Sequence, residues 1–590
     1  MKKLVYFTSI FCGFILGGCT LPQMIKLAKN QNLTASPNPL EVHKDTVVFD
    51  LSASLPVKML KPNTTYTLNT FYKYGDQERA LEPLTFKSVD FPQASTQQPK
   101  LSKKFSFPYS PALKNGLIQI EGVASKGSKS KTTPRLDVAT GILTTSKLVQ
   151  DNYYVSFADH GYNNQEEIIP VIIPNFLFDQ GSSVLRKTEI SGLSGKELDA
   201  FIASKNITRT VTITGTHSPE GRERVNSKLS EDRAAAIEKF YRAEMKKYDY
   251  QGLSDNIRFV LKPVVDDWTS FKEALKNYSG ITEAEKSEFN NIINAGGTFP
   301  QVEEKLSKLA TYKKVYNDIY PGLRTAKTEI FIVKKKKTDI EISVLAKQIL
   351  NGQAGKDALS MEEFLYAASL TPSLEEKANL YQAATKMGTS WVAHNNLAAT
   401  WLSLGLQNRS NLNDYAEQAA TQLEIAARLR NSNEVNANMA TVALIQGNPW
   451  KAFSFSNRAL NGASNEISRG VNGVKAACEI HMAKYSQAIA SASAAAGTPV
   501  NLFNRGLAQL LTKDYGNAYA SFLEATRSGN TFAMGYYGAA VAAARQGKET
   551  ELLTNLVTAI KLDPSLKETA SGDLEFSKWS GTDSFRNALK

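Results

Sequence analysis

The side chains best suited to chemistry lie in the stretch 214–237, where a turn joins a strand-like run to a helix-like one. The turn carries His217, Ser218 and Glu220, and Arg233 follows in the helix-like run. Valine and isoleucine alternate with threonine before the turn, and apolar residues recur at helical spacing after it. The pattern therefore predicts a strand, a turn and a helix, with hydroxyl and charged side chains gathered near the turn.

These residue types do not add up to a catalytic set. His217 and Ser218 have the chemistry of a base and a nucleophile, but adjacent turn residues seldom face each other, and no orienting acid is identifiable. His160 and His217 lie far apart without cysteine or carboxylate at ligand spacing. Carboxylates of a helix-rich stretch cannot be paired across a cleft and are read as helix-surface groups: Asp266, Asp267, Glu283, Glu285 and Glu288. We predict a protein that is not an enzyme, with no catalytic residue, metal or cofactor.

The same stretch resembles the peptidoglycan-binding domain of the OmpA family. That family's strand, loop and helix read roughly G-x-x-D-x-x-G, four residues, then N-x-x-L-S-x-x-R-A. The positions that fall on this frame without a gap are Gly215, Gly221, Asn226, Leu229, Ser230, Arg233 and Ala234. Ser218 stands where the family has its loop aspartate.

The resemblance implies a site for the zwitterionic end of diaminopimelate in the peptide stem. In the family the aspartate pairs with the ammonium, and the arginine makes a forked pair with the carboxylate. Arg233 is then the carboxylate ligand here, and Asn226 is a further candidate contact to the peptide stem. Ser218 cannot supply the negative charge, and Glu220, two residues on, is the hypothetical replacement. The alternative interpretation is that Arg233 only anchors loop carbonyls and that the fold is kept for its shape.

The N-terminus has the features of a bacterial lipoprotein signal. Lys2 and Lys3 precede an apolar run, 4–16, that is too short to span a bilayer permanently. The run ends in Leu-Gly-Gly-Cys at Cys19, which resembles the lipobox, whose cysteine is alkylated with diacylglycerol. Thr20 follows instead of an acidic residue, so retention at the inner membrane is not indicated. We expect a lipid on Cys19, a stable membrane anchor and a body in the periplasm.

The totals fit a multidomain globular protein near an anionic surface. The chain has 590 residues, of which 42% are hydrophobic and 21% are charged, so three or four domains are expected. Its net charge is +12, and removal of two signal lysines leaves +10. Such an excess suits anionic lipid or cell-wall polymer, and no nucleic-acid motif is present. Of its three cysteines, only Cys478 lies beyond the lipoprotein signal, and its apolar neighbours predict a buried thiol.

Two domains are expected before residue 338. After a signal peptide (1–18) and a lipidated polar tether (19–36), short alternating runs separated by turn clusters predict an Ig-like β-sandwich over 37–150. The OmpA resemblance covers 160–337 and implies an α/β domain. A helix-rich insertion at 263–323 has no counterpart in that family.

The remaining chain is alanine-rich and self-similar. Small residues recur with a period of about 34 residues over 339–566, as in the tetratricopeptide repeat. Stacked helix pairs of this kind form a solenoid whose concave face commonly holds extended peptides or partner helices. We expect protein partners on the array, with 567–590 as a C-terminal tail.

Together these features predict a non-enzymatic outer-membrane lipoprotein that acts as a scaffold. In the first hypothesis it links the membrane to peptidoglycan through the OmpA-like domain and recruits protein through the repeats. In the second it is an accessory subunit of an outer-membrane assembly or secretion complex, and the OmpA-like domain no longer holds the wall. A third possibility, an enzyme acting on wall sugar or peptide, lacks a catalytic constellation.

Overall fold

The structure is a computed structural model that describes residues 20–248, 253–264 and 268–590. Contacts within the chain divide it into two units. Unit 1 combines the residues up to Tyr162 with Asp339–Lys590, and unit 2 is Asn163–Thr338. The chain therefore leaves unit 1, forms unit 2 and returns. Among the described residues, no helix has the length and apolar character needed to span a membrane.

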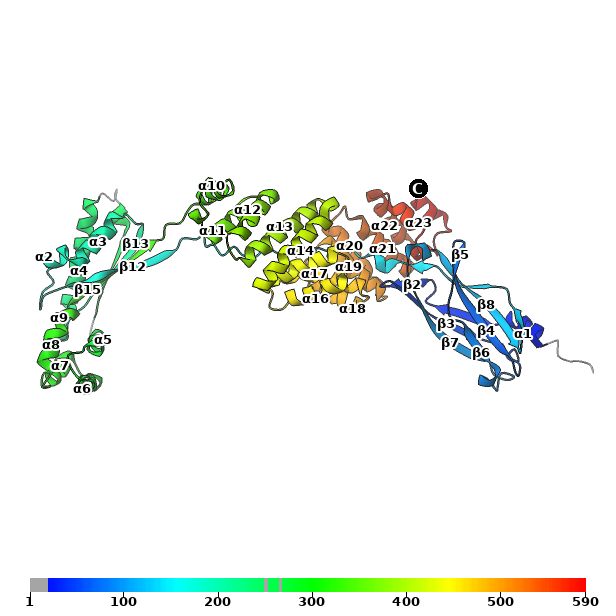
Figure 1. Ribbon diagram of the computed structural model, residues 1–590, viewed down its shortest axis with the longest axis horizontal. Helices are drawn as coiled ribbons and strands as arrows, with labels where there is room; N and C mark the ends of the chain where they lie inside the picture. The colour runs from blue at the N-terminus through cyan, green and yellow to red at the C-terminus, as the bar shows by residue number, and fades with distance from the viewer. Residues whose placement is uncertain (1–19, 249–252, 265–267) are drawn as a thin grey trace, which may run out of the picture. The chain divides into compact units, whose positions relative to one another are not determined.

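The N-terminal part of unit 1 consists of two antiparallel-rich sheets that share one core. Buried and exposed residues alternate along the strands, because one side of each strand faces the other sheet and contributes to the shared core. The first sheet contains β1 (Asn32–Ser36), β2 (Leu40–His43), β3 (Thr46–Ser54), β7 (Lys100–Pro108) and β11 (Ile142–Leu143). The second contains β4 (Thr65–Tyr74), β5 (Gln77–Ala80), β6 (Leu84–Lys87), β8 (Gly116–Lys126), β9 (Lys129–Thr132) and β10 (Leu136–Thr140). The predicted two-layer β region is present (Figure 1).

Ordered structure begins earlier than the sequence predicted. The segment expected to be a tether, 19–36, contains helix α1 (Thr20–Ala28) and strand β1. Leu21, Met24 and Ala28 recur at helical spacing and are buried in the core of the two sheets. The prediction weighed the polar content of this segment and missed its apolar stripe.

Unit 2 contains a four-stranded sheet with helices packed on it. The strand order is β12–β15–β13–β14, with β13 and β14 parallel and the other neighbours antiparallel. Helices α3 and α4 bury their apolar residues in the same cluster as the central strands (Figure 1). The strands are β12 (Ile168–Leu177), β13 (Thr208–Gly215), β14 (Arg258–Pro263) and β15 (Thr325–Val333). The helices are α2 (Lys187–Ser191), α3 (Leu193–Ala203) and α4 (Glu223–Lys247).

The predicted insertion of unit 2 is helical and has an aromatic core of its own. Phe271, Phe289 and Tyr320 are fully buried there. Two of its helices, α7 and α8, are separated by a turn at 307–311, which brings Leu309 and Tyr312 back onto the cluster. The helices are α5 (Thr269–Asn277), α6 (Glu283–Asn294), α7 (Phe299–Leu306), α8 (Tyr312–Asp318) and α9 (Tyr320–Leu323).

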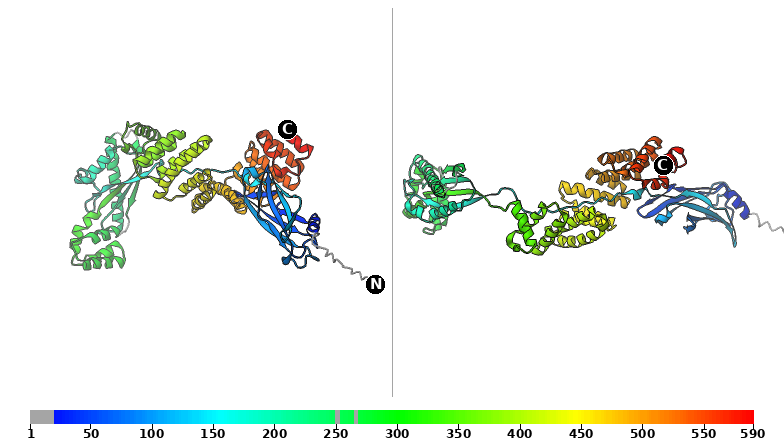
Figure 2. Two further views of the ribbon diagram at one scale, coloured as in Figure 1. Left: turned by 45° about the vertical axis from the view of Figure 1, so that its right-hand side comes forward. Right: turned by 90° about the horizontal axis from the view of Figure 1, so that it is seen from above.

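The C-terminal part of unit 1 is an all-helical, tetratricopeptide-like solenoid of stacked antiparallel pairs (Figures 1 and 2). Small residues are buried wherever paired helices approach, as in the run Ala539–Ala544 of α21. The first members are α11 (Met361–Leu370), α13 (Trp391–Gln407), α15 (Asn433–Ile445), α17 (Asn465–His481), α19 (Pro499–Leu511) and α21 (Ala533–Gln546). The second members are α12 (Leu374–Met387), α14 (Leu412–Leu429), α16 (Pro449–Ala459), α18 (Tyr485–Ala494), α20 (Tyr515–Ser528) and α22 (Glu549–Leu562). Helix α10 (Asp339–Leu350) precedes the pairs.

The expected C-terminal tail is an ordered cap. It contains α23 (Leu566–Ser571) and α24 (Asp583–Ala588), and Phe576 and Phe585 enter the core of the last helix pairs. Buried Glu575 pairs with Arg545 of α21, at 2.9 Å from Nη2 to Oε1, and accepts a hydrogen bond from Thr145. The cap therefore covers the apolar end of the array, as terminal repeats must.

Candidate functional site

The predicted turn lies at the end of β13, pressed against α4. A Cβ on Gly215 would lie 1.9 Å from the carbonyl oxygen of Ser230, so only glycine allows this approach. Gly221 has φ +107°, a conformation that other residues rarely adopt. The two glycines of the frame thus shape the loop, whether or not it binds a ligand.

Arg233 is buried and anchors the backbone of the surrounding loops. It is 1% exposed. It donates to the carbonyl oxygens of Thr216 at 2.7 Å, Ser182 at 3.0 Å and Asp179 at 3.3 Å. Burial, assisted by the charge of nearby Arg324, lowers the pKa of Arg233 to about 10, so it stays protonated at neutral pH. This is the loop-anchoring role that the sequence left open as an alternative.

Ser218 and Glu220 are joined to a second arginine, Arg324, which no local sequence pattern marks as their partner. Arg324, at the start of β15, donates from Nε to Ser218 Oγ at 3.0 Å and from Nη2 to Glu220 Oε1 at 2.7 Å. Glu220 Oε2 is buried and has no hydrogen-bond partner among the described residues. One carboxylate oxygen is thus held by Arg324 and the other is left unpaired.

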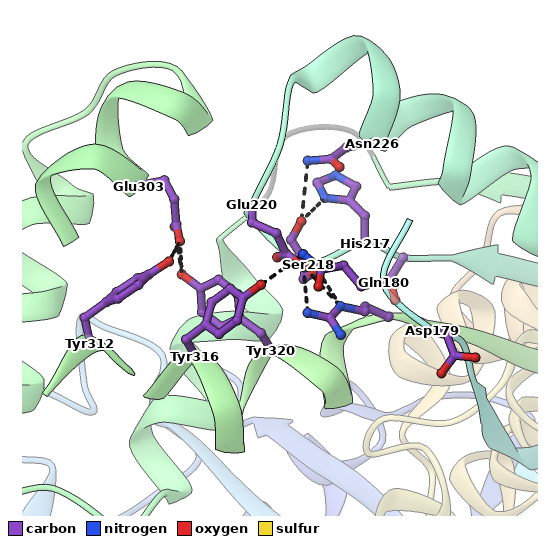
Figure 3. Close-up of polar contacts among 12 residues, drawn as sticks. Asp179, Gln180, His217, Ser218, Glu220, Asn226, Glu303, Tyr312, Tyr316 and Tyr320 are labelled. Atoms are coloured by element: carbon purple, nitrogen blue, oxygen red, sulfur yellow. Dashed lines mark hydrogen bonds and ion pairs between the residues drawn. The ribbon is translucent and has the colours of Figure 1, made fainter. Parts of the chain in front are cut away.

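Asn226 and His217 hold the same turn from the other side. Asn226 Nδ2 donates to the Ser218 carbonyl at 3.4 Å, and His217 Nδ1 lies 3.0 Å from the same oxygen (Figure 3). His217 therefore contacts the backbone of Ser218 and not its hydroxyl, which Arg324 occupies. The pair is not a nucleophile with its base.

A pocket of about 610 Å³ opens beside the turn. The loop, α4 and the insertion helix α8 all contribute to its wall. Its lining includes Gln180, Glu220, Asn226, Arg233, Tyr312, Lys313 and Tyr316. The insertion, unmatched in the OmpA frame, therefore forms one side of the predicted site (Figure 3).

A buried carboxylate supports the insertion side of this pocket. Glu303 of α7 accepts hydrogen bonds from the hydroxyls of Tyr312 and Tyr320, the latter at 2.7 Å. Burial raises the pKa of Glu303, although both tyrosine hydroxyls oppose the rise, and the charge of Glu220 adds to it. Glu303 thus holds Tyr312, which lines the pocket, and Tyr320, which lies behind it in the core of the insertion.

The remaining candidate residues from the sequence can be placed only where the structure describes them. No group of three or more histidine, cysteine or acidic side chains is arranged to hold a metal within 20–248, 253–264 and 268–590. Cys478 is buried as expected, and burial raises the pKa of its thiol to about 12. Cys19, Asp266 and Asp267 lie outside the described residues, so the lipidation site stays a prediction.

A second candidate site lies on the helix array, where the sequence predicted protein partners but not the segment of this chain that lies there. The segment 149–162, here called the strap, runs extended across the first helices of successive pairs. Four side chains, here called the polar ladder, each bind both the N–H and the C=O of one strap residue, as a neighbouring β-strand would. The ladder consists of Asn396 on Ala158 (2.7 and 2.9 Å), Asn438 on Ser156 (2.8 and 2.8 Å), Thr441 on Tyr154 (3.1 and 2.6 Å) and Asn504 on Gln150 (3.0 and 2.7 Å).

The spacing explains why one extended segment meets several helices. The eight steps from Gln150 to Ala158 span about 26 Å at a rise of about 3.3 Å per residue. Four first helices, α19, α17, α15 and α13, lie along this length, and helix axes pack at about 8–10 Å. The length of the extended segment therefore matches the distance across the four helices.

Helix α17 contributes no side chain to the polar ladder, and two of its glycines instead make room for the strap. A Cβ on Gly470 would lie 2.2 Å from the Tyr154 ring, and one on Gly473 would lie 2.1 Å from Asn152 Nδ2. Glycine inside a helix costs about 1 kcal/mol relative to alanine. Its presence at both positions indicates that α17 is shaped around the strap. The array thus holds a segment of its own chain where the sequence had suggested a partner.

Comparisons with known proteins give only distant likenesses. No protein-family model and no curated protein matches the chain. The C-terminal part of a TPR repeat-containing protein from Cytophaga hutchinsonii is 12% identical, over 38% of this chain and 97% of that one, with a TM-score of 0.27. Pseudomonas aeruginosa PilF is 17% identical, over 33% of this chain and 97% of that one, with a TM-score of 0.24. The TPR2AB domain of yeast Sti1 in complex with pHSP90 is 13% identical, over 43% of this chain and 98% of that one, with a TM-score of 0.18.

Proposed function

We propose that this protein is a non-enzymatic scaffold of the cell envelope, an accessory subunit of an outer-membrane assembly or secretion complex. A lipid on Cys19 holds it to the outer membrane, and its body lies in the periplasm. The observation that carries the proposal is the polar ladder, since a face that binds main-chain groups through side chains is built to hold polypeptide. A binding surface of this kind, and no reacting group, is what a scaffold requires.

The geometry of unit 2 favours this function over direct attachment to the wall. Arg233 gives its hydrogen bonds to three backbone carbonyls and is 1% exposed. Glu220 Oε1 accepts a hydrogen bond from Arg324 Nη2 at 2.7 Å. Both charges of the expected diaminopimelate grip are therefore already committed within the fold, which supports an OmpA-like domain kept for its shape.

Wall attachment is the second candidate function, and one observation favours it. Glu220 Oε2 has no partner among the described residues and lies at the wall of the 610 Å³ pocket. Lys313 lines the same pocket, is exposed, and has no ion pair among the described residues. An ammonium at Glu220 and a carboxylate at Lys313 would together hold a zwitterionic stem peptide.

A pull-down on purified peptidoglycan sacculi separates the two functions. The scaffold proposal predicts that the protein does not sediment with sacculi above the level of an unrelated lipoprotein. Wall attachment predicts sedimentation that Glu220→Gln and Lys313→Ala abolish, while the exposed Lys305→Ala variant keeps it. Arg233→Ala is not a useful test here, because it removes three backbone anchors and disturbs the loop itself.

The anchor has its own test. Globomycin treatment or Cys19→Ala should shift the protein out of the membrane fraction, because the proposed anchor is the lipid and no helix among the described residues could span a membrane. Unchanged membrane fractionation of the alanine variant would count against lipidation. The partner itself is sought by affinity purification from envelope, with a tag on the C-terminal cap.

A further inference from the structure

Only one edge of the strap is occupied. In an extended chain the main-chain groups of successive residues point alternately to opposite sides. The groups of Gln150, Tyr154, Ser156 and Ala158 point to the polar ladder. The N–H and C=O groups of the intervening residues Tyr153, Val155 and Phe157 have no hydrogen-bond partner among the described residues, so they form an open strand edge. Here this edge is called the free edge.

We propose that the free edge is the docking site of the array, where an extended acidic segment of a partner protein adds as a second strand. The proposal rests on the scaffold function and names the surface and the kind of partner. Strand addition to an exposed edge is an established mode of peptide binding, in which main-chain hydrogen bonds supply affinity and neighbouring side chains supply specificity.

The strap is a suitable template because it is already ordered. The polar ladder fixes four of its residues through both main-chain groups, and Gly470 and Gly473 seat two of its side chains. A template held in the bound conformation loses little conformational entropy when a partner arrives. The free edge is also accessible, since Phe157 is 42% exposed and Tyr153 and Val155 are half-buried.

Three cations beside the free edge favour an acidic partner. Of the acidic groups near the same segment, Asp151 acts on Tyr153 but lies 2.8 Å from His481, and Glu434 and Glu466 act on Tyr154, a residue that the polar ladder holds. Arg409 lies over the Tyr153 ring at 5.3 Å, Lys377 over Phe157 at 5.9 Å, and Arg430 over Trp391 at 4.9 Å. None of these three cations has a carboxylate partner among the described residues. Each retains hydrogen-bonding capacity, so glutamate or aspartate side chains of an added strand would complete the ion pairs.

A second copy of this chain is the competing occupant, because open edges also pair with each other. The three cations argue against it, since two copies would bring the same positive charges together. Sedimentation of the purified protein decides this point. A dimer that Val155→Pro converts to monomer would assign the free edge to self-association and overturn the proposal.

The direct test is peptide binding to the full-length protein, with a fluorescent peptide of alternating valine and glutamate and its valine–lysine counterpart as probes. We expect the glutamate peptide to bind, the lysine peptide to bind at least tenfold more weakly, and added salt to weaken the former. Val155→Pro removes one N–H of the free edge and leaves the polar ladder intact, so it should reduce affinity at least tenfold. Val155→Ala, which keeps the N–H, should change it less than threefold.

A charge-reversed variant keeps the test informative if the proline variant does not fold. Arg409→Glu with Lys377→Glu should invert the preference between the two peptides. Equal binding of both peptides, absence of binding, or insensitivity to both Val155→Pro and charge reversal would overturn the proposal. These outcomes concern the free edge alone, whereas failure of the scaffold function would appear as an absence of any envelope partner.

Discussion

Asn438→Ala is the substitution that most sharply tests how the strap is held. Asn438 Oδ1 accepts the Ser156 N–H, and Nδ2 donates to the Ser156 carbonyl and to Asn395 Oδ1 at 3.0 Å. Both Asn438 and Ser156 are buried, at 0% and 4% exposure. Alanine removes all three hydrogen bonds and offers nothing in their place.

The expected loss follows from the groups left without partners. The Ser156 carbonyl keeps a second bond, from Asn395 Nδ2 at 3.1 Å, but the Ser156 N–H and Asn395 Oδ1 lose theirs. A buried polar group left unpaired costs about 1–3 kcal/mol. Two such groups give about 2–6 kcal/mol, and we expect the lower half of that range because the strap can shift toward water.

Hydrogen exchange measured by mass spectrometry reports this loss locally. The peptides covering 150–158 should exchange at least tenfold faster in Asn438→Ala than in the wild type, while α21 keeps its protection. Asn457→Ala, on the exposed side of α16, is the matched control and should change neither. If exchange of 150–158 is the same in both variants, the polar ladder does not hold the strap.

Three further perturbations test other parts of the structure. Gly470→Ala should speed protease cleavage of the strap, because its Cβ would meet the Tyr154 ring at 2.2 Å; unchanged cleavage would contradict this packing. Arg233→Ala should destabilise unit 2 by about 2–4 kcal/mol in urea unfolding, because three carbonyls lose their donor, and Arg233→Lys should recover little of it. The pKa of Glu303 is raised by burial, with Glu220 adding to the rise against the hydroxyls of Tyr312 and Tyr320. Its stabilising contribution is therefore complete below the unfolded pKa of about 4.3 and is lost as pH rises through the folded value. Glu303→Gln should flatten this dependence in pH-dependent urea unfolding.

Periodicity alone located most elements of the fold. The apolar alternation over 209–214 and the helical repeat after it gave β13 and α4, and the small-residue spacing after 339 gave the helix pairs. It failed where the pattern was short or mixed. Helix α1 has only nine residues, and its apolar stripe lies in a segment, 19–36, that is otherwise mostly polar. The cap after α22 was taken for a tail because its few aromatic residues have no regular spacing.

The candidate site was only partly predictable, for a physical reason. Ser218, Glu220, Asn226 and Arg233 do come together around one loop, as their positions on the frame implied. Arg324, which takes up the charge of Glu220, is 104 residues away in sequence, and nothing local marks it as their partner. The hydrogen bonds of the strap involve its main-chain groups, which are the same for every residue type, so no sequence pattern predicts them. The recurrence of asparagine on α13, α15 and α19 was the available signal, and it becomes meaningful only when those helices are known to stack.

The proposed function is that this protein holds other proteins at the envelope without making or breaking a bond. Its most direct test is affinity purification of the C-terminally tagged protein from detergent-solubilised envelope, followed by mass spectrometry. The scaffold account predicts one or a few envelope proteins in amounts comparable to the bait, with the N-terminal peptide carrying lipid on Cys19. Recovery of the bait alone, from the soluble fraction and with an unmodified Cys19, would contradict it.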